Sequence, residues 1–375
     1  MGKISINNET ILEILMNLHD RKSKISIIMH AFADENDFVA QNLNAKEISL
    51  RLDPVKYHIF MFHKNKPDPR ILKRKNIELI KVSENKYFAS IQVLFELLKN
   101  SSDIFFYVRT FEIDYFYFLL KRFFGDTKYT IHSIENVLPY PTNRKMYHII
   151  AKSNALHSDY VTSVSNYVAE TAENEYNIQT DVVYVGIDTS FFSPSDHKMN
   201  SNIEVLFVGS LQKRKRPNLV LEAAKQFPEQ KFTIVGKGPL EENLRVTIEE
   251  ENLLNVSIYS HLSSSELLEK YQSADIFLFP SVHEGFPKVT LEAASCGLPV
   301  IAFNNYQTET VVDGKTGFIV GSIDEMMEKL RLLIEDNDLR VNFGKNAREY
   351  VRRFDWEEIV KRWDEIFSKI IGLKY

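Results

Sequence analysis

Short apolar runs alternate with stretches of helical spacing along most of this chain. In the first half, strand-like runs occupy residues 24–30, 57–63, 78–82, 104–108, 129–132, 160–163 and 182–185, and helical spacing is seen at 9–21, at 38–52 and between most of the runs. Such alternation is typical of βαβ units, whose strands pair in parallel. A doubly wound α/β domain is therefore predicted over residues 1–185.

The alternation stops at residues 186–202 and then starts again. This interval contains Pro194 and a polar cluster, which are typical of a linker. Beyond it, strand-like runs lie at 203–208, 231–235, 256–259, 275–279 and 299–303, and helices are predicted to begin near Pro217, Pro239, Ser265 and Pro287. We expect a second parallel-sheet domain over 203–354, followed by a segment, 355–375, whose helix is long enough to reach back to the first domain.

Length and composition agree with two domains of a soluble globular protein. The chain has 375 residues, more than one core usually supports, with 44% hydrophobic and 26% charged residues. A net charge of -5 gives no sign of a nucleic-acid partner. A single cysteine, Cys296, excludes an internal disulfide and fits a reducing cytoplasm. The sequence shows neither a secretory signal nor an apolar run of the ~18 residues that a spanning helix needs, so we expect a cytoplasmic protein.

One aromatic-rich segment leaves two interpretations open. Residues 105–124 hold many aromatic side chains, and Lys121 and Arg122 lie beside Phe123 and Phe124. A membrane-surface helix would have this composition, which makes peripheral contact with the inner face of a membrane one expectation. A core strand followed by a core helix would also have it, and the nearly continuous apolar positions from Tyr115 to Leu120 favour the core.

The loops that follow the strands of the second domain contain the candidate chemistry. Ligands of parallel sheets bind at the carboxyl ends of the strands. There the sequence has Gly209 and Ser210 before four cations at 213–216, Gly236 and Gly238 after the next strand, and Leu262 after the third. The fourth loop, 280–287, leads into a helix through His283, Glu284 and Pro287.

The fourth loop and its helix can bind an anion and a diol together. Pro287 suits the first helical position, and the free amides that follow attract phosphate. Glu292 lies about one and a half turns into the helix, where its carboxylate can accept hydrogen bonds from a ribose diol. By spacing alone, the favoured interpretation of Glu284 and Glu292 is an amphipathic helix with a solvated glutamate at each end, and only the surroundings can overturn it.

In this order, the loops resemble the C-terminal half of the retaining glycosyltransferases of family 4, also called group 1 glycosyltransferases. The resemblance continues in Val185–Thr189 with Phe192 and Pro194, in Ala274–Asp275, in Leu291–Ala293 with Cys296–Val300, and in Glu309, Asp313–Gly314 and Thr316–Gly317. It is close over residues 182–360 and loose before them. It implies the GT-B architecture, two Rossmann-like doubly wound parallel-sheet domains facing a central cleft, with the acceptor on the N-terminal side and the donor on the C-terminal side.

The resemblance also implies roles for individual residues. His132, Lys215 and Glu284 are the catalytic candidates: Lys215 beside the donor diphosphate, Glu284 beside the transferred sugar, and His132 near the sugar and the acceptor. Donor-binding candidates are Gly209, Ser210, Lys215, Gly236, Leu262, Gly285, Phe286, Pro287, Lys288, Val289, Thr290 and Glu292. Acceptor-side candidates are Asp34, Glu35, Asn36 and Arg109.

The implied reaction moves a sugar, with retention, from a nucleoside-diphosphate sugar to an acceptor hydroxyl. A fixed cation and helix-start amides stabilise the charge that develops on a leaving diphosphate. The sequence has no compact His/Asp/Glu cluster, so we expect neither a metal nor another cofactor. The acceptor is expected to be a glycan, a lipid-linked molecule or a small molecule, in the synthesis of a cell-surface glycan or glycoconjugate. The alternative is a catalytically silent GT-B subunit that binds sugar nucleotides or serves as a scaffold.

Two positions depart from the pattern of many relatives. Ser210 stands where many of them carry an arginine, and Arg214 or Arg216 is a candidate to replace that cation. Many relatives also have a glycine-rich loop after the first strand, whereas residues 33–37 are acidic and contain no glycine. Because carboxylates repel a phosphorylated acceptor, a neutral acceptor is predicted.

Overall fold

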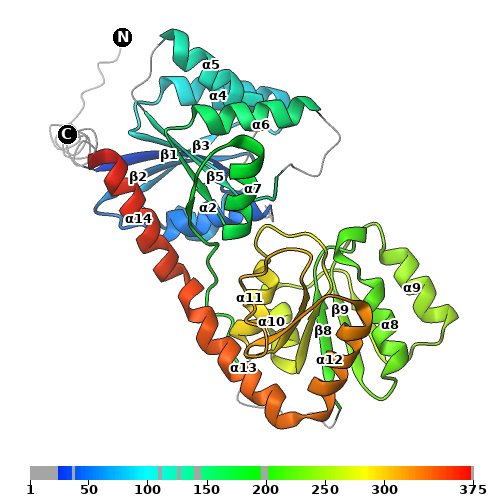
Figure 1. Ribbon diagram of the computed structural model, residues 1–375. Coiled ribbons are helices and arrows are strands. Elements are labelled where there is room, and N and C mark those ends of the chain that lie inside the picture. The colour runs from blue at the N-terminus through cyan, green and yellow to red at the C-terminus, as the bar shows by residue number, and fades with distance from the viewer. Residues whose placement is uncertain are drawn as a thin grey trace, which may run out of the picture. The chain divides into compact units, whose positions relative to one another are not determined.

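The computed structural model describes residues 24–35, 39–108, 112–124, 128–138, 145–195 and 202–372, and it divides into two compact units (Figure 1). Unit 1 comprises Met1–Val164, Val168–Val183 and Ile359–Tyr375, and unit 2 comprises Ser165–Tyr167 and Tyr184–Glu358. The chain therefore enters unit 2 near Tyr184 and returns to unit 1 after Glu358. The leading helix expected at 9–21 lies outside the described residues.

Unit 1 is built on a parallel sheet of seven strands. Their order is β3 (Ile77–Lys81), β2 (Tyr57–His63), β1 (Ile25–Phe32), β4 (Ile104–Tyr107), β5 (Tyr129–Ile134), β6 (Tyr160–Ser163) and β7 (Asp181–Val182). The helices connecting these strands are α2 (Ala40–Arg51), α3 (Pro69–Leu72), α4 (Lys86–Lys99), α5 (Glu112–Phe124), α6 (Lys145–His157) and α7 (Asn166–Tyr176). The sequence order 3-2-1-4-5-6 places the crevice of a doubly wound sheet at the carboxyl ends of β1 and β4.

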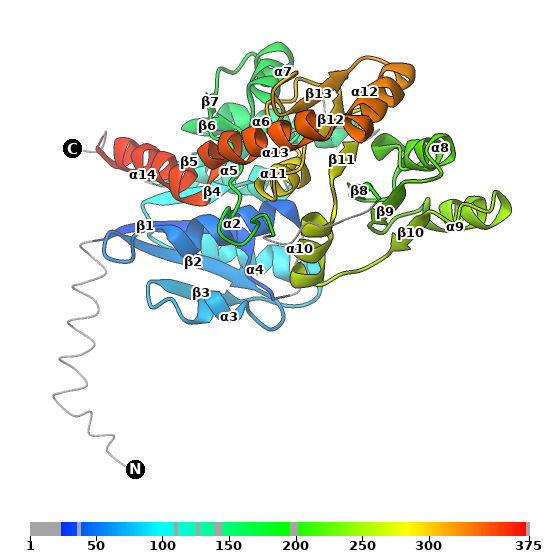
Figure 2. The ribbon, with the colours of Figure 1, turned by 90° about the horizontal axis from the view of Figure 1, so that it is seen from below.

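Unit 2 repeats the same strand order with six parallel strands (Figure 2). The order is β10 (Val256–Tyr259), β9 (Lys231–Val235), β8 (Glu204–Val208), β11 (Ile276–Phe279), β12 (Val300–Phe303) and β13 (Gly317–Val320). The helical elements are η1 (Lys213–Lys215), α8 (Asn218–Gln226), α9 (Glu241–Glu250), α10 (Ser264–Ser273), α11 (Lys288–Ser295), α12 (Ile323–Glu335), α13 (Asn337–Val351) and η2 (Arg352–Phe354). The corresponding crevice lies after β8 and β11.

The two parallel α/β sheets confirm the predicted fold class. The bounds of β2, β6, β9 and β10 are those predicted, whereas β13 was not predicted and β5 continues for two residues past His132. Pro287 is the N-cap residue of α11, with ψ at 99°, so the helix begins at Lys288 and the prediction was one residue early.

The aromatic-rich segment is mostly core. All four residues of β4 are buried, with Phe105 against Tyr117 of α5 and Phe106 against Trp363 on the opposite face of the sheet. Trp363 belongs to α14 (Trp356–Gly372), whose residues from 359 onward lie in unit 1. On α5, however, Phe116 and Leu119 are exposed, and the side chains of Phe123 and Phe124 lie outside the described residues. None of the described helices is long and apolar enough to cross a membrane.

Residues 186–195 are folded into unit 2. The backbone of Ile187 exchanges hydrogen bonds with Phe354 and Trp356, and Phe192 is buried. Gly186 lies so close to the Trp356 indole that a Cβ there would stand 2.3 Å from the ring, which leaves no room for any other residue. Two segments distant in sequence are therefore hydrogen-bonded side by side where the chain crosses between the units.

Candidate active site

The loop after β8 folds the basic run into a single 3₁₀ turn. Lys213–Lys215 form η1, and Arg216 follows in the left-handed conformation at φ 47°. A 3₁₀ turn has three residues per turn, so successive side chains point in different directions. The four cations therefore diverge, and Lys215 is the one that becomes buried.

Lys215 and Glu284 form a nearly buried ion pair. The Lys215 Nζ lies 2.6 Å from Glu284 Oε1, and the two side chains are 10% and 11% exposed. The ammonium also lies 4.8 Å from the centre of the Phe279 ring. Burial lowers the pKa of Lys215, while the Glu284 carboxylate opposes that shift. The structure thus brings together two of the three predicted catalytic residues, on the loops that follow β8 and β11.

Further hydrogen bonds fix the loop that carries Glu284. The amide of Val282 donates to the carbonyl of Arg214 at 2.9 Å, and the Ser281 hydroxyl donates to Glu284 Oε1 at 2.5 Å. The Arg214 Nη1 donates both to His283 O at 3.0 Å and to Glu284 Oε1 at 2.8 Å. One carboxylate oxygen therefore accepts from a lysine, an arginine and a serine.

Arg216 is occupied elsewhere. Its Nε donates to Pro280 O at 2.6 Å, and its guanidinium lies 3.9 Å from the centre of the Phe303 ring. These contacts join the loop after β8 to β11 and β12 and leave Arg216 away from Glu284. Of the two arginines that the sequence offered as a replacement cation, Arg214 is the one beside the carboxylate.

Two glycines after β9 allow the first two loops to pack backbone to backbone. A Cβ on Gly236 would stand 1.9 Å from Gly209 O, and one on Gly238 would stand 2.4 Å from Leu211 O. Gly236 also has φ 155°, and Leu211 N donates to Lys237 O at 2.8 Å. The structural reason for Gly236 is therefore the approach of the Gly209 loop itself.

The N-terminus of α11 is open. Among the described residues, the amides of Lys288 and Val289 have no hydrogen-bond acceptor, whereas Thr290 N donates to Pro287 O. The buried Thr290 hydroxyl lies 2.6 Å from Pro287 O and 2.7 Å from Thr310 Oγ1, so it holds the helix start in place. Two free amides directed along a helix axis attract an anion.

Glu292 is largely buried and has one hydroxyl partner. The Tyr271 hydroxyl donates to Glu292 Oε2 at 2.9 Å. Burial raises the pKa of Glu292, and both Lys288 and the Tyr271 hydrogen bond oppose that shift. Since a carboxylate has two oxygens, Oε1 remains for a further donor such as a ribose hydroxyl.

The other donor-side candidates serve the packing of this region. The ring centre of Phe286 lies 5.4 Å from that of Tyr184 and 5.5 Å from that of Phe354. Leu262 and Phe286 both pack against the hydrophobic core of unit 2 that contains Phe354. The carbonyl of Gly285 accepts from the Ser165 hydroxyl at 2.8 Å. Ser210 accepts from Gln212 N through its carbonyl, and no side-chain contact in the described structure gives it a role.

His132 lies inside β5 of unit 1 and is 1% exposed. Its ring stacks on Tyr107 of β4 with 4.3 Å between ring centres and 14° between planes. Burial lowers the pKa of His132 to about 3, so the imidazole is neutral at physiological pH. In register, Tyr107 pairs with His30 of β1 on its other side, and His30 Nδ1 lies 2.7 Å from Asp114 Oδ1.

The acceptor-side candidates are only partly described. The Asp34 carboxylate accepts from the amides of Lys64 and Asn65, at 3.1 and 2.7 Å to Oδ1, and is nearly buried. Glu35 forms a surface ion pair with Lys66 at 2.8 Å. Asn36 and Arg109 lie outside the described residues.

Sequence reasoning missed several polar groups around these sites. Ser281 and Tyr271 contact the two glutamates, and Tyr306 is 3% exposed with its pKa raised by burial and by the charge of Glu284. Ser281 is local, three residues before Glu284, but a serine at that spacing is not distinctive, whereas Tyr271 and Tyr306 come near the glutamates only through the tertiary fold. Within the described residues, no group of three or more His, Cys, Asp or Glu side chains is arranged to hold a metal ion.

Comparison of sequences connects the C-terminal unit to a family. Residues 190–350 match the family model described as "Glycosyl transferases group 1". The chain is 30% identical over 187 residues to the sulfoquinovosyl transferase SQD2 of Arabidopsis thaliana, covering 46% of this chain and 36% of that protein. It is 31% identical over 197 residues to the capsular polysaccharide biosynthesis glycosyltransferase CapM of Staphylococcus aureus, covering 48% and 50%. The chain spans 36% to 60% of the length of the curated relatives that it matches.

Comparison of structures covers both units. Anabaena HepE, solved in complex with UDP and glucose, superposes with a TM-score of 0.76 at 16% identity, over 92% of this chain and 100% of that chain. At this identity the similarity establishes the GT-B type of fold and nothing more.

Proposed function

Because residues 190–350 match the family model of the group 1 glycosyl transferases, we propose that the chain is a member of that family and that it transfers a sugar from a nucleoside-diphosphate sugar to an acceptor hydroxyl. The observation that carries the proposal is the buried Lys215–Glu284 pair, which joins the loops after β8 and β11 at the carboxyl ends of parallel strands, with the open start of α11 following the loop that carries Glu284. This is where a doubly wound sheet binds its ligands.

The proposed chemistry follows from the charges in unit 2. As the bond between the sugar and the diphosphate breaks, negative charge grows on the leaving diphosphate. Lys215 and the amides of Lys288 and Val289 stabilise that charge more than the ground state, which lowers the barrier. These groups supply the stabilisation without a metal ion, and the sugar keeps its anomeric configuration, as in the retaining family.

The remaining candidates have complementary tasks in this proposal. Glu284 lies beside the transferred sugar, and Glu292 accepts hydrogen bonds from the ribose through its second oxygen. Because the His132 imidazole is neutral, it serves as a hydrogen-bonding group toward the sugar and the acceptor and brings no positive charge. A cell-surface glycan or glycoconjugate is the proposed product class, supported by the name of the S. aureus relative.

A ligand panel tests this proposal directly. We expect UDP-, GDP-, ADP- or TDP-sugars to raise the apparent melting temperature, since binding stabilises the folded state by about 2.7 kcal/mol at 100 times Kd. Hydrolysis or transfer of the sugar from the donor that binds is then followed by chromatography. If no donor produces a shift at millimolar concentration, the proposal is wrong. Binding without turnover on any acceptor would instead indicate a catalytically silent subunit.

We also propose that unit 1 associates with an anionic lipid surface on the cytoplasmic side of a membrane. Helices α4, α5 and α6 lie side by side (Figure 1). Among the side chains that the structure describes on these helices, ten large apolar ones are exposed: Tyr87, Phe88, Ile91, Phe95, Leu98, Phe116, Leu119, Met146, Ile149 and Leu156. On α4 these residues recur at helical spacing and so share one face, and a concentration of this kind marks an interaction surface.

Charge on the same helices favours lipid as the occupant. Lys86 and Lys99 lie at the two ends of α4, each near an exposed aromatic ring, and α6 has Lys145 and Lys152 but no acidic residue. Each cation near an anionic bilayer contributes about 1 kcal/mol, and aromatic side chains insert at the headgroup level.

Vesicle sedimentation tests the lipid proposal. The protein is expected to sediment with vesicles containing phosphatidylglycerol and to remain in solution with phosphatidylcholine alone. Replacing Phe88 and Phe95 together by serine is expected to abolish sedimentation, whereas Leu254→Ser, an exposed site in unit 2, is the matched control. Failure of the wild type to sediment overturns the proposal. So does a dimer, detected by light scattering, that becomes a monomer when the same two residues are replaced by serine.

A further inference from the structure

We infer that Arg214 is the second cation of the donor diphosphate site and that it binds a phosphate through Nε and Nη2. This inference rests on the proposed function. It adds Arg214 to the donor site, a residue to which the resemblance assigns no fixed role. It also explains how a chain with Ser210 at the usual arginine position retains two cations beside Glu284.

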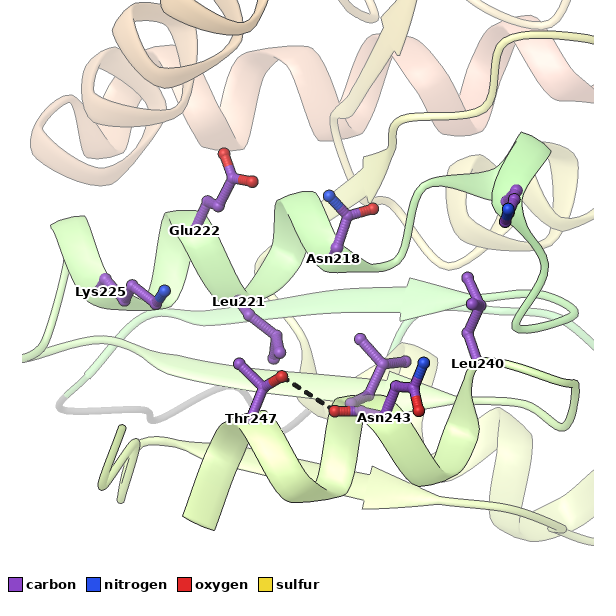
Figure 3. Close-up of a pocket in the computed structure, with 9 residues that line it drawn as sticks. Asn218, Leu221, Glu222, Lys225, Leu240, Asn243 and Thr247 are labelled. Carbon is purple, nitrogen blue, oxygen red and sulfur yellow. Dashed lines mark hydrogen bonds between the residues drawn. The ribbon is translucent and has the colours of Figure 1, made fainter. Parts of the chain in front are cut away.

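The structure separates the four cations of the basic run by what they contact. Lys213 is exposed and lines a groove between α8 and α9, where Asn218, Leu221 and Asn243 lie (Figure 3). Arg216 is used by Pro280 O and the Phe303 ring. Only Lys215 and Arg214 converge on one atom, Glu284 Oε1, at 2.6 and 2.8 Å.

Arg214 is anchored by one end of its guanidinium only. Nη1 donates to His283 O and Glu284 Oε1, which accounts for both of its hydrogens. Among the described residues, Nε and Nη2 have no acceptor, and the side chain is 41% exposed, against 10% for Lys215. Nε and Nη2 form the planar fork that matches two oxygens of a phosphate.

The local charge favours an anion of more than one charge. Lys215 and Arg214 bring two positive charges to the single negative charge of Glu284, so the cluster has an uncompensated positive charge. A diphosphate bridging a sugar and a nucleoside has one negative charge on each phosphate. The buried ammonium then meets one phosphate and the exposed fork meets the other, while Nη1 continues to hold Glu284.

A matched set of variants tests the inference. Arg214→Ala is expected to weaken binding of the nucleoside diphosphate of the preferred donor by about 10- to 100-fold, the range for losing hydrogen bonds to a charged group. Arg214→Lys keeps the charge without the fork and is expected to fall between the wild type and Arg214→Ala. Lys213→Ala removes the same charge from the same turn away from Glu284, so its affinity is expected to change by less than about twofold.

Two further measurements separate binding from folding. The melting temperature of each variant without ligand reports any loss of stability. If Arg214→Ala does not fold, Arg214→Lys still tests the inference. Pyrophosphate, used as a probe, is expected to lose affinity in parallel with the diphosphate, whereas the corresponding nucleoside, which has no phosphate, is expected to bind all variants equally.

The outcomes distinguish this inference from the proposed function. If wild-type protein binds no nucleotide, the proposed function fails. If the wild type binds and transfers, but Arg214→Ala and Arg214→Lys bind the diphosphate and pyrophosphate as the wild type does, the proposed function stands and Arg214 is not part of the site. An equal loss of diphosphate affinity in Lys213→Ala would also overturn the inference. It would show that affinity depends on the total positive charge of the turn and not on Arg214.

Discussion

The two units share one strand order, and both join their first two loops through backbone, but unit 2 does so by close glycine packing whereas unit 1 adds a buried carboxylate. In unit 2, the loop after β8 packs on the loop after β9 through bare backbone, made possible by Gly236 and Gly238. In unit 1, the loop after β1 is joined to the loop after β2 by backbone hydrogen bonds, from Glu35 N to Lys66 O and from Asp68 N to Ala33 O. A side chain adds to them, because the Asp34 carboxylate accepts from the amides of Lys64 and Asn65.

This difference shows where each unit has polar groups left for a ligand. Backbone packing in unit 2 leaves the side chains of the loop free to form the Lys215, Arg214 and Glu284 cluster. In unit 1, the most prominent carboxylate of the loop is already committed to backbone amides. Asp34 is therefore a structural residue as well as an acceptor-side candidate, and an acceptor has to be recognised by other groups nearby.

The largest expected effect is on catalysis in unit 2. Lys215→Ala and Glu284→Ala are each expected to reduce sugar transfer by about 10²-fold or more, the scale for removing an electrostatic stabiliser. Initial rates with the donor found in the ligand panel measure this. Lys213→Ala is the control for charge, and near-normal rates in either site variant would show that the cluster is not catalytic.

The loop comparison itself is tested by stability. Gly236→Ala is expected to destabilise the protein by about 2–4 kcal/mol, since it adds a clash with Gly209 O to a strained φ. Gly314→Ala, with φ 67° and open space around it, has the strain without the clash and is expected to cost about 1–2 kcal/mol. Equal costs in urea unfolding would contradict the backbone-packing explanation.

The corresponding change in unit 1 is Asp34→Ala. Removing the acceptor of two nearly buried amides is expected to cost about 2–3 kcal/mol, whereas Asp34→Asn retains one acceptor oxygen and costs less. Urea unfolding followed by a probe in each unit measures both. A loss confined to transfer, with no change in unfolding free energy, would assign Asp34 to the acceptor alone.

His132 provides a pH test of unit 1. Its pKa of about 3 lies below the ordinary value of 6.5, so the unfolded chain binds more protons between these values. The stabilising contribution is complete above pH 6.5 and is lost as the pH falls toward 3, with a limiting slope of about 1.4 kcal/mol per pH unit. In His132→Gln, the free energy of unfolding is expected to depend less on pH between 3 and 6.5. If the pH profiles of unfolding free energy are parallel for wild type and variant, the histidine is not buried as described.

The smallest expected effect concerns Tyr271→Phe in unit 2. Loss of the hydroxyl removes a donor to the buried Glu292 and is expected to cost about 1 kcal/mol of stability at neutral pH. The pKa of Glu292 rises further in this variant, so nucleotide affinity is expected to fall several-fold at mildly acidic pH. Calorimetric titration at two pH values measures the nucleotide affinity. If the affinity is unchanged at both, Glu292 does not bind the ribose.

Sequence periodicity predicted most of the fold because buried parallel strands are continuous apolar runs. It missed β13, since Gly317–Val320 begins with a glycine and leaves a run of only three apolar residues. It also assigned the apolar face of α4 no special role, because spacing alone does not distinguish a face that packs on a core from one that meets solvent.

The candidate site was predictable in part. The resemblance named Lys215 and Glu284, which the structure brings together as an ion pair, but it could not predict the different contacts of the four cations, which depend on a 3₁₀ turn and a left-handed Arg216. Tyr271 and Tyr306 come from other parts of unit 2, so no local pattern predicts them, and Ser281, three residues before Glu284, has no spacing that distinguishes it from an ordinary loop serine. Arg109 and Asn36 stay predictions.

The pairing of the segment around Ile187 with residues 354–356 has a consequence for how this chain can be cut and rejoined. Ile187 and its neighbours are hydrogen-bonded to residues 354–356, so the two ends of unit 2 already lie next to each other in its own fold. Apart from Ser165–Tyr167, unit 2 is thus one continuous segment whose ends lie together in space, the arrangement that permits a module to be transplanted. Residues 184–358 form a natural cassette for exchange between related chains, with the host sequence resuming at the helix that follows.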